Sequence, residues 1–198
     1  MAQKLNWKKF IRFWSKFYNN DKYQDKKFYY PYIRDLSKND FLDELWLWKM
    51  QVHFYNRTNK KALKSMRENI ETIRSFRGSN PTFNDLYKFS RKIFKSGVVY
   101  PAFLIHICKP NDYPIFDQHV FRAFTLLTTK KIVDAPKDIQ DYLSYRRFVF
   151  SILKKYKIGL RDIDKALMAF GQFLNNPQKF LKSPKANSRL RKFDTIIL

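Results

Sequence analysis

Apolar residues recur along much of the chain at intervals of three and four, the spacing that places side chains on one face of an α-helix. The clearest case runs from Ser37 to Tyr55, with a stripe formed by Phe41, Leu45, Trp48, Val52 and Tyr55 and widened by Leu42, Trp46 and Met50. A helix that is apolar on so much of its circumference is expected at the centre of a core. Because no segment sustains the alternation typical of strands, the pattern predicts an all-α fold.

Further helices are predicted on both sides of this segment, bounded by capping residues and glycines. Gly78, Gly97 and Gly159 stand where three of the apolar stripes stop, and Asn80-Pro81-Thr82 precedes another stripe. Residues 19–31, rich in lysine and tyrosine, are predicted to form a loop or an irregular arm. The predicted helices span residues 7–18, 58–78, 82–97, 98–108, 117–127 and 137–159, and a last one begins near residue 162.

Length and composition limit how this helical chain can be organised. With 198 residues, of which 44% are apolar, the chain can bury one core or two small lobes that share a cleft. We therefore expect residues 1–183 to form a single compact helical unit. Residues 184–198 are expected to form a basic C-terminal tail, because the segment from Lys179 to Lys192 carries six basic residues and no acid.

The charge of the chain indicates its partner. Forty lysines and arginines stand against seventeen acids, a formal net charge of +23, and such a polycation attracts phosphate polymers through counterion release. Nucleic acid is therefore the leading partner, although codon bias in an AT-rich genome or a merely solvated basic face would also raise the lysine content. No apolar run approaches the roughly 18 residues of a spanning helix, and Met1 to Lys9 does not resemble a signal peptide. We expect a soluble monomer without membrane contact, either cytoplasmic or nucleoid-associated, or nuclear in a eukaryote.

Metal ions and cofactors are not expected. Cys108 is the only cysteine, so an internal disulfide and a thiolate zinc cluster are excluded, and the residue is read as a small buried side chain. The histidines at 53, 106 and 119 lack the spacing of metal ligands, and His53 and His106, which lie on apolar faces, are expected to be core or half-buried residues. The four glycines are isolated from one another, whereas loops that cradle phosphates need several close together.

The most informative motif places Asp117 at the start of a predicted helix, just after a loop that contains prolines. The segment reads Tyr113-Pro114-Ile115-Phe116-Asp117-Gln118-His119-Val120-Phe121-Arg122. Together with the preceding Gly97 turn and helix, it resembles the helix-hairpin-helix base-excision DNA glycosylases, in which the hairpin and a helix precede apolar-Pro-apolar-apolar-Asp-x-His-Val-x-Arg. The resemblance is concentrated in residues 80–127, and the helix at 162–171 could supply the family's closing helix.

The resemblance implies two helical lobes around a basic cleft, and a DNA glycosylase that removes a damaged or modified base, most readily from double-stranded DNA. Asp117 would be the catalytic residue. In the family the hairpin binds a phosphate through backbone amides. The DNA contacts implied in this chain are Ser96, Gly97 and Val98 of the turn, with Arg91, Lys92, Lys95, His119 and Arg122.

Two departures from the family pattern bear on the activity. The family hairpin usually has two glycines, whereas this chain reads Ser96-Gly97-Val98-Val99 and has one. Bifunctional members carry a lysine at the position that Val99 occupies, and neither Lys92 nor Lys95 has the matching spacing. The family's iron–sulfur cysteine cluster is also missing from the sequence. We therefore expect a monofunctional enzyme.

The chemistry can be argued from the residues as well. Hydrolysis of an N-glycosidic bond passes through an oxocarbenium-like sugar, so one ionised carboxylate can stabilise the growing positive charge and orient a water molecule. The target base must leave the duplex, and aromatic side chains commonly hold it by stacking. The aromatic candidates are Tyr100, Phe116, Trp46 and Trp48, each of which could instead belong to the core.

Every assignment has a structural alternative. Asp117 can serve only as a helix cap, because aspartate is among the preferred N-cap residues. His119 can be a packed or hydrogen-bonded helix residue, and Arg122 can form an internal ion pair instead of a phosphate contact. For the whole chain, the main alternative is a nonenzymatic DNA-binding protein on the same scaffold. An RNA-targeting protein, with aromatic side chains stacked on splayed bases, ranks third.

Overall fold

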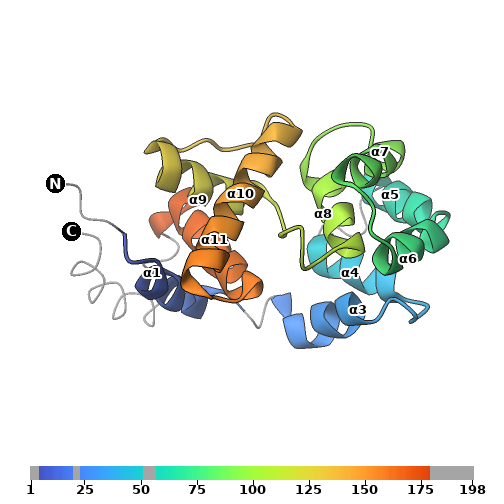
Figure 1. Cartoon of the computed structure of the whole chain (residues 1–198), viewed down its shortest axis with the longest axis horizontal. Coiled ribbons are helices and arrows are strands. Elements are labelled where there is room, and N and C mark those ends of the chain that lie inside the picture. Colours follow the sequence, from blue (N-terminus) through green and yellow to red (C-terminus); the bar gives the residue numbers. More distant parts are fainter. Residues whose placement is uncertain (1–4, 20–22, 51–56, 179–198) are drawn as a thin grey trace. The chain divides into compact units, whose positions relative to one another are not determined.

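The computed structural model describes residues 5–19, 23–50 and 57–178. Within these ranges the chain forms ten α-helices and no strand, which confirms the all-α prediction. The chain divides into two compact units, whose helices are labelled in Figure 1. We name the unit made of Met1–Tyr18 and Pro114–Leu198 the terminal unit, and the unit made of Asn19–Tyr113 the middle unit. The predicted tail, residues 184–198, lies outside the described residues, as does His53.

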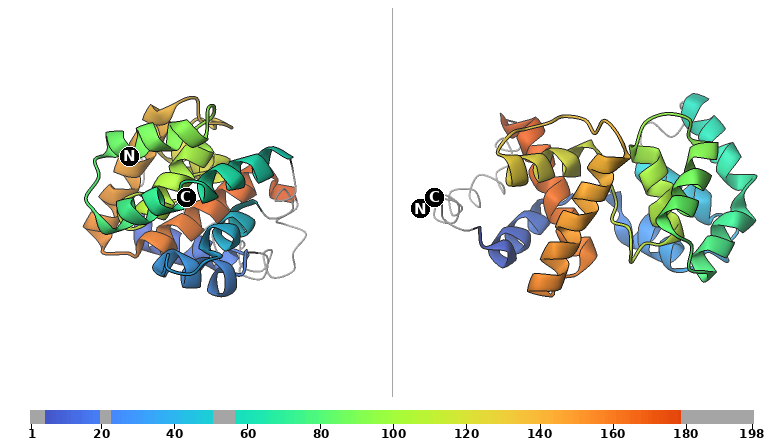
Figure 2. Two further views of the ribbon diagram at one scale, coloured as in Figure 1. Left: turned by 90° about the vertical axis from the view of Figure 1, so that its right-hand side faces the viewer. Right: turned by 45° about the horizontal axis from the view of Figure 1, so that its top comes forward.

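In the terminal unit, one helix touches the other three described helices. The helices are α1 (Trp7–Trp14), α9 (Gln118–Thr129), α10 (Ile139–Tyr156) and α11 (Leu160–Asn175), with α11 as their common neighbour. Figures 1 and 2 show α1, α9 and α10 beside α11. The core is aromatic, since the ring of Phe170 lies 5.2 Å from the ring of Phe10 and 4.9 Å from that of Trp14, measured between centroids.

The middle unit has α8 as its most deeply buried helix. Its elements are the π-helical turn η2 (Asp25–Tyr29), α3 (Tyr30–Arg34), α4 (Phe41–Met50), α5 (Arg57–Arg67), α6 (Ile70–Gly78), α7 (Phe83–Ile93) and α8 (Val99–Cys108). Every residue of α8 from Pro101 to Cys108 is buried. The helix predicted at the centre, α4, is also buried over most of its length, and residues 51–55 of that prediction lie outside the described part of the chain.

His106 of α8 is a buried residue with both ring nitrogens bonded. A carbonyl oxygen can only accept, so Nδ1 donates to the carbonyl oxygen of Tyr113 at 2.6 Å. The other nitrogen, Nε2, lies 2.8 Å from the hydroxyl of Tyr29, which donates to it when the ring is neutral. His106 therefore links η2 to the end of the loop after α8, and the prediction that it lies in or near the core is confirmed.

Two sequence predictions of local structure are wrong. Residues 19–31 were expected to form a loop or an irregular arm, but from Asp25 onward η2 and α3 follow one another, and Pro31 is tolerated because it occupies the first turn of α3. The single helix predicted over 58–78 is broken into α5 and α6. The break occurs at Asn69, whose side-chain amide donates to the carbonyl oxygen of Ser65 at 2.8 Å, in competition with the helix backbone.

Several helix ends also differ from the prediction. α7 begins with the expected cap, since Thr82 and Asp85 form a capping box, but it ends at Ile93 because Phe94 is extended. α10 ends at Tyr156, where Lys157 takes a left-handed conformation with φ 53°. Gly159 does not terminate α10; it is the N-cap of α11.

Two negative observations apply to the described residues. No helix among them is long and apolar enough to cross a membrane. In the same part of the chain, histidine, cysteine, aspartate and glutamate side chains nowhere gather in threes or more to form a possible metal site. Cys108 is fully buried at the end of α8, as its position in an apolar stripe predicts.

Candidate functional site

Asp117 is the N-cap residue of α9. Its backbone is extended, and its Oδ1 atom accepts hydrogen bonds from the amides of His119 at 2.7 Å and Val120 at 3.0 Å. These amides belong to the first turn of the helix, where no intrahelical acceptor is available. The N-terminal end of a helix also favours a negative charge. The two hydrogen bonds hold the carboxylate in a fixed orientation. Asp117 is only half-buried, so the residue keeps some exposed surface.

Tyr145 of α10 lies within electrostatic reach of Asp117. The residue is fully buried, and its hydroxyl has no hydrogen-bond partner among the described residues. Burial raises the pKa of Tyr145 well above its ordinary value, and the Asp117 carboxylate raises it further. The Tyr145 ring packs against Phe116, with 5.2 Å between the ring centroids. Asp117 is therefore next to an aromatic core that contains one unsatisfied hydroxyl.

Arg122 joins three parts of the terminal unit. Its Nε donates to Oδ1 of Asp134 at 2.9 Å, and its Nη1 lies 3.4 Å from the carbonyl oxygen of Gly171 and 3.1 Å from Nδ1 of His119. Because a guanidinium can only donate, Nδ1 of His119 is the acceptor. The Arg122 side chain is 5% exposed.

This network decides between the two roles considered for Arg122. The structure contains the internal ion pair, and a covered guanidinium is not presented to a DNA backbone. We therefore remove Arg122 from the predicted phosphate contacts. His119 is half-buried and hydrogen-bonded within its helix, which matches the structural alternative considered for it.

The turn between α7 and α8 depends on Gly97 and Arg91. Gly97 has a φ of +71°, a left-handed conformation that favours glycine. The Nη1 atom of Arg91 donates to the carbonyl oxygen of Gly97 at 3.0 Å, and its Nη2 donates to the carbonyl oxygen of Lys95. Arg91, predicted as a DNA contact, therefore also stabilises the turn from within the middle unit.

The surface of this turn is exposed and basic. Its exposed residues are Lys92, Lys95, Ser96 and Gly97. A Cβ atom on Gly97 would meet nothing within 4 Å, so a ligand has room to approach the backbone. α8 begins at Val99 with no side-chain cap, so the amides of Val99 and Tyr100 have no acceptor in the helix or in a cap, while Pro101 has no amide proton. Such amides suit a phosphate oxygen, whereas the Val98 side chain is buried and can contribute only its backbone.

The aromatic candidates for a base pocket lie mostly in the two cores. Trp46 and Phe116 have no exposed surface, and Trp48 is 6% exposed. The indole of Trp48 donates to Oδ1 of Asp25 at 3.1 Å, which satisfies its polar atom in the middle unit. Covered rings cannot stack on a base, so we assign these three residues to the cores rather than to a pocket. Tyr100 is half-buried and stays a candidate.

The predicted site residues fall into two groups, each arranged within its own unit. Residues 116–122 belong to the terminal unit, whereas residues 91–100 and the two tryptophans belong to the middle unit. Sequence reasoning missed two features: the unpartnered hydroxyl of Tyr145, which a sequence cannot reveal, and a cluster of cations on α5. The second had a visible signal, because four basic residues occur between Arg57 and Lys64.

Comparison with known proteins adds no further evidence on function. No protein-family model matches the chain, and no curated protein or solved structure matches it. The features that bear on function are therefore the chain's own, chiefly the capped carboxylate of Asp117 and the exposed Gly97 turn.

Proposed function

We propose that the protein is a monofunctional DNA glycosylase that hydrolyses the N-glycosidic bond of a base turned out of the duplex. The observation that carries the proposal is the motif from Tyr113 to Arg122, in which Asp117 is oriented by hydrogen bonds from two backbone amides and is only half-buried. The net charge of +23 supports a nucleic-acid substrate. The helix-hairpin-helix arrangement, with a basic cleft between two lobes, is part of the proposal.

In this mechanism Asp117 acts through its negative charge. As the bond between C1′ and the base nitrogen breaks, the base leaves with the bonding electrons and the sugar becomes positively charged. A carboxylate oriented by the amides of His119 and Val120 stabilises that cation. A water oxygen bonds to C1′, its proton passes to the carboxylate or to solvent, and the departing base takes up a proton. The products are the free base and an abasic sugar, with water as the second reactant.

Val99 occupies the position at which bifunctional members of the family carry a lysine, so a valine there favours water over an amine as the nucleophile. An amine nucleophile would form a covalent intermediate with the sugar. Valine cannot do so, and Val99 is the first residue of α8, where its side chain is half-buried. The expected product is therefore an intact strand with an abasic site.

DNA would be held through its phosphates by the Gly97 turn. Lys92 and Lys95 supply positive charge there, and the first amides of α8 supply donors. Contacts of this kind position a protein on DNA but carry no sequence information. Recognition of the base would require pocket residues, and Tyr100 is the aromatic candidate that retains exposed surface.

The activity can be tested with purified protein and a panel of DNA duplexes that carry plain, damaged or hypermodified bases. Heating in alkali after incubation cuts a strand wherever a base has been removed. The proposal predicts cutting at one class of base. Binding to the duplexes without cutting of any of them would contradict it.

A nonenzymatic DNA-binding protein is the second candidate, and one observation favours it. The hydrogen bonds from two backbone amides to Oδ1 of Asp117 form a complete N-cap, which is a sufficient structural reason for an aspartate at this position. Both candidates predict steep salt dependence of DNA binding. Base release, which only the first candidate predicts, separates them.

A further inference from the structure

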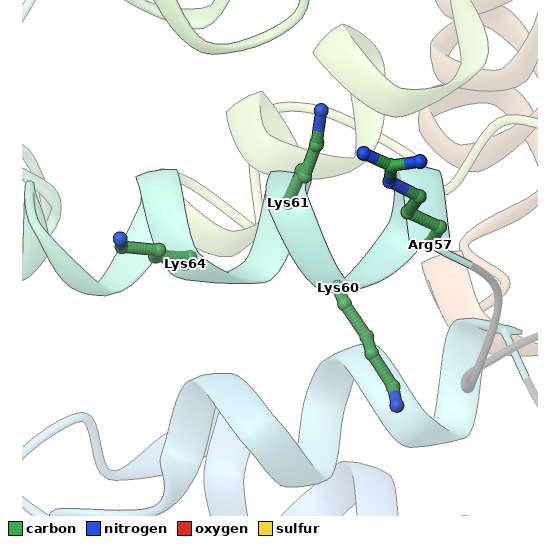
Figure 3. A pocket seen from close by; sticks show the side chains of 4 residues that line it. All are labelled: Arg57, Lys60, Lys61 and Lys64. Carbon is green, nitrogen blue, oxygen red and sulfur yellow. The ribbon is translucent and has the colours of Figure 1, made fainter.

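α5 carries four cationic side chains around one groove. Arg57, Lys60, Lys61 and Lys64 line a surface depression of about 380 Å³, and all four residues are exposed. With a rise of 1.5 Å per residue, they extend over about 10 Å of helix. Figure 3 shows Arg57 and Lys61 on one side of α5, Lys60 on the opposite side, and Lys64 one turn further along the helix. The groove is thus lined by positive charge.

This charge pattern is unfavourable for the helix itself. The first turn of α5 contains no acid, although the N-terminal end of a helix disfavours cations. Like charges three or four residues apart destabilise a helix, and Arg57 forms such pairs with both Lys60 and Lys61. A local conflict of this kind is expected at functional positions.

Two of the four cations that line the groove have no ion-pair partner among the described residues. Arg57 and Lys61 form no ion pair with any residue that the structure describes. Lys64 lies 3.9 Å from a carboxylate oxygen of Glu68, but both side chains are largely exposed, and exposed pairs contribute little. An anion bound in the groove would therefore meet two cations, Arg57 and Lys61, that form no ion pair with a described residue.

The opposite face of α5 fixes the helix in the middle unit. Leu63 and Met66 are buried in the core. The indole nitrogen of Trp46 donates to the carbonyl oxygen of Asn59 at 3.2 Å, which attaches the first turn of α5 to α4. The cations are therefore presented by a helix whose position does not depend on a ligand.

The burial of this face also distinguishes between two kinds of polyanion. A helix that binds a membrane surface inserts its apolar face between the lipids. In α5 that face, with Leu63 and Met66, is already occupied by the protein core. The groove is lined by the side chains of four cations, whose charged ends suit the hydrated phosphates of a nucleic acid.

We propose that Arg57, Lys60, Lys61 and Lys64 bind the phosphate backbone of a nucleic acid, as a second contact in addition to the Gly97 turn. α5 packs against α7, the helix that leads into that turn. Both surfaces belong to the middle unit. One strand of a duplex presents a phosphate about every 3.4 Å of axis, so about 10 Å of helix can face about three phosphates. The identification of the polymer as DNA rests on the proposed function, but the contact does not require Asp117.

A matched pair of full-length variants tests the proposal. The first carries Arg57→Gln, Lys60→Gln, Lys61→Gln and Lys64→Gln, which removes four charges while keeping good helix formers. The control carries Lys8→Gln, Lys131→Gln, Lys137→Gln and Lys154→Gln, four exposed lysines of the terminal unit. Both variants have the same net charge. Binding to a duplex is measured by fluorescence anisotropy over a series of salt concentrations.

The α5 variant is expected to bind at least about tenfold more weakly than the control at low salt. Its plot of log affinity against log salt concentration should be shallower by about three, because each lost phosphate contact removes about 0.9 from the slope. Its thermal midpoint should equal or exceed that of the wild type, since repulsion within α5 is relieved. Equal losses in both variants, or unchanged binding in the α5 variant, would overturn the proposal.

Base release separates the failure of this inference from the failure of the proposed function. If the wild type binds DNA but releases no base, and the α5 variant binds weakly, the contact stands and the glycosylase is refuted. If the wild type releases a base and the α5 variant binds as tightly as the control, the contact is refuted. Vesicles that contain phosphatidylserine form a third arm. Wild-type binding to these vesicles without binding to DNA would overturn the assignment to nucleic acid.

Discussion

The carbonyl oxygen of His119 lies 1.9 Å from the position that a Cβ atom on Gly171 would occupy. α9 and α11 therefore meet backbone to backbone, two residues after the Asp117 cap. Arg122 reinforces the contact, because its Nη1 is 3.4 Å from the carbonyl oxygen of Gly171. Packing against α11 thus positions the end of α9 that carries Asp117.

Replacing Gly171 with alanine should force these two helices apart. We expect Gly171→Ala to lower the free energy of unfolding by about 1–3 kcal/mol, the usual range for overpacking, as measured by urea denaturation. Gly78→Ala is the matched control, since a Cβ atom there would meet nothing within 4 Å. The control should change stability by less than about 0.5 kcal/mol. Similar losses in the two variants would contradict the close approach of α9 and α11.

Gly97 should be sensitive to backbone conformation rather than to volume. Its φ of +71° is left-handed, and the space around a Cβ atom is empty. Gly97→Ala is therefore expected to cost about 1 kcal/mol of stability. Gly97→Asn should cost less, because asparagine tolerates this conformation better. Thermal unfolding compares the two variants, and an alanine variant at least as stable as the asparagine variant would argue against the left-handed turn.

Tyr142 and Tyr145 provide a matched pair of buried hydroxyls. Both side chains are fully buried, but Tyr142 donates to the carbonyl oxygen of Pro114 at 3.2 Å, whereas the Tyr145 hydroxyl has no partner among the described residues. Tyr142→Phe should destabilise the protein by about 1 kcal/mol, and Tyr145→Phe should leave its stability unchanged or raise it. Denaturant unfolding measures both, and the opposite order would refute this assignment of the two hydroxyls.

Cys108 should contribute to a loss of stability at alkaline pH. Burial raises the pKa of its thiol from 9.0 to about 12, although Arg77 and Lys109 oppose the shift. Because the pKa is higher in the folded state, the unfolded chain releases the proton first. The contribution of Cys108 is therefore complete below about pH 9 and is lost as the pH rises from 9.0 to about 12.

The measurement is the free energy of unfolding at a series of pH values across this window. Cys108→Ala should be less stable at neutral pH because it leaves a cavity, but its stability should fall less steeply with rising pH. Tyr145 is present in both proteins, so its raised pKa affects both curves equally. Parallel curves for the wild type and Cys108→Ala would contradict the role of the thiol.

Much of the fold could be predicted because apolar stripes at helical spacing correspond to buried helix faces. The stripes at 98–108 and 117–127 correspond to α8 and α9 within two residues at each end. Residues 25–31 were wrongly predicted because a segment with charged residues, tyrosines and a proline resembles a loop in sequence, although Tyr29 is buried and Pro31 lies in the first turn of α3. The break at Asn69 depends on one side-chain hydrogen bond, which periodicity cannot show.

The candidate site could be predicted only where its geometry is local. Capping of α9 by Asp117 follows from residues two and three positions away, so the sequence indicated it. The partner of Arg122 could not be predicted, because Asp134 is brought to it by the loop after α9. The buried faces of Trp46 and Phe116 likewise depend on packing between elements.

Asp117→Asn tests the central claim most directly. Asparagine caps a helix nearly as well as aspartate but carries no charge, so the thermal midpoint should stay close to that of the wild type. The account predicts that this folded variant loses base release from duplex DNA by at least about a hundredfold, because the forming sugar cation is no longer stabilised. Base release at the wild-type rate by folded Asp117→Asn would contradict the account.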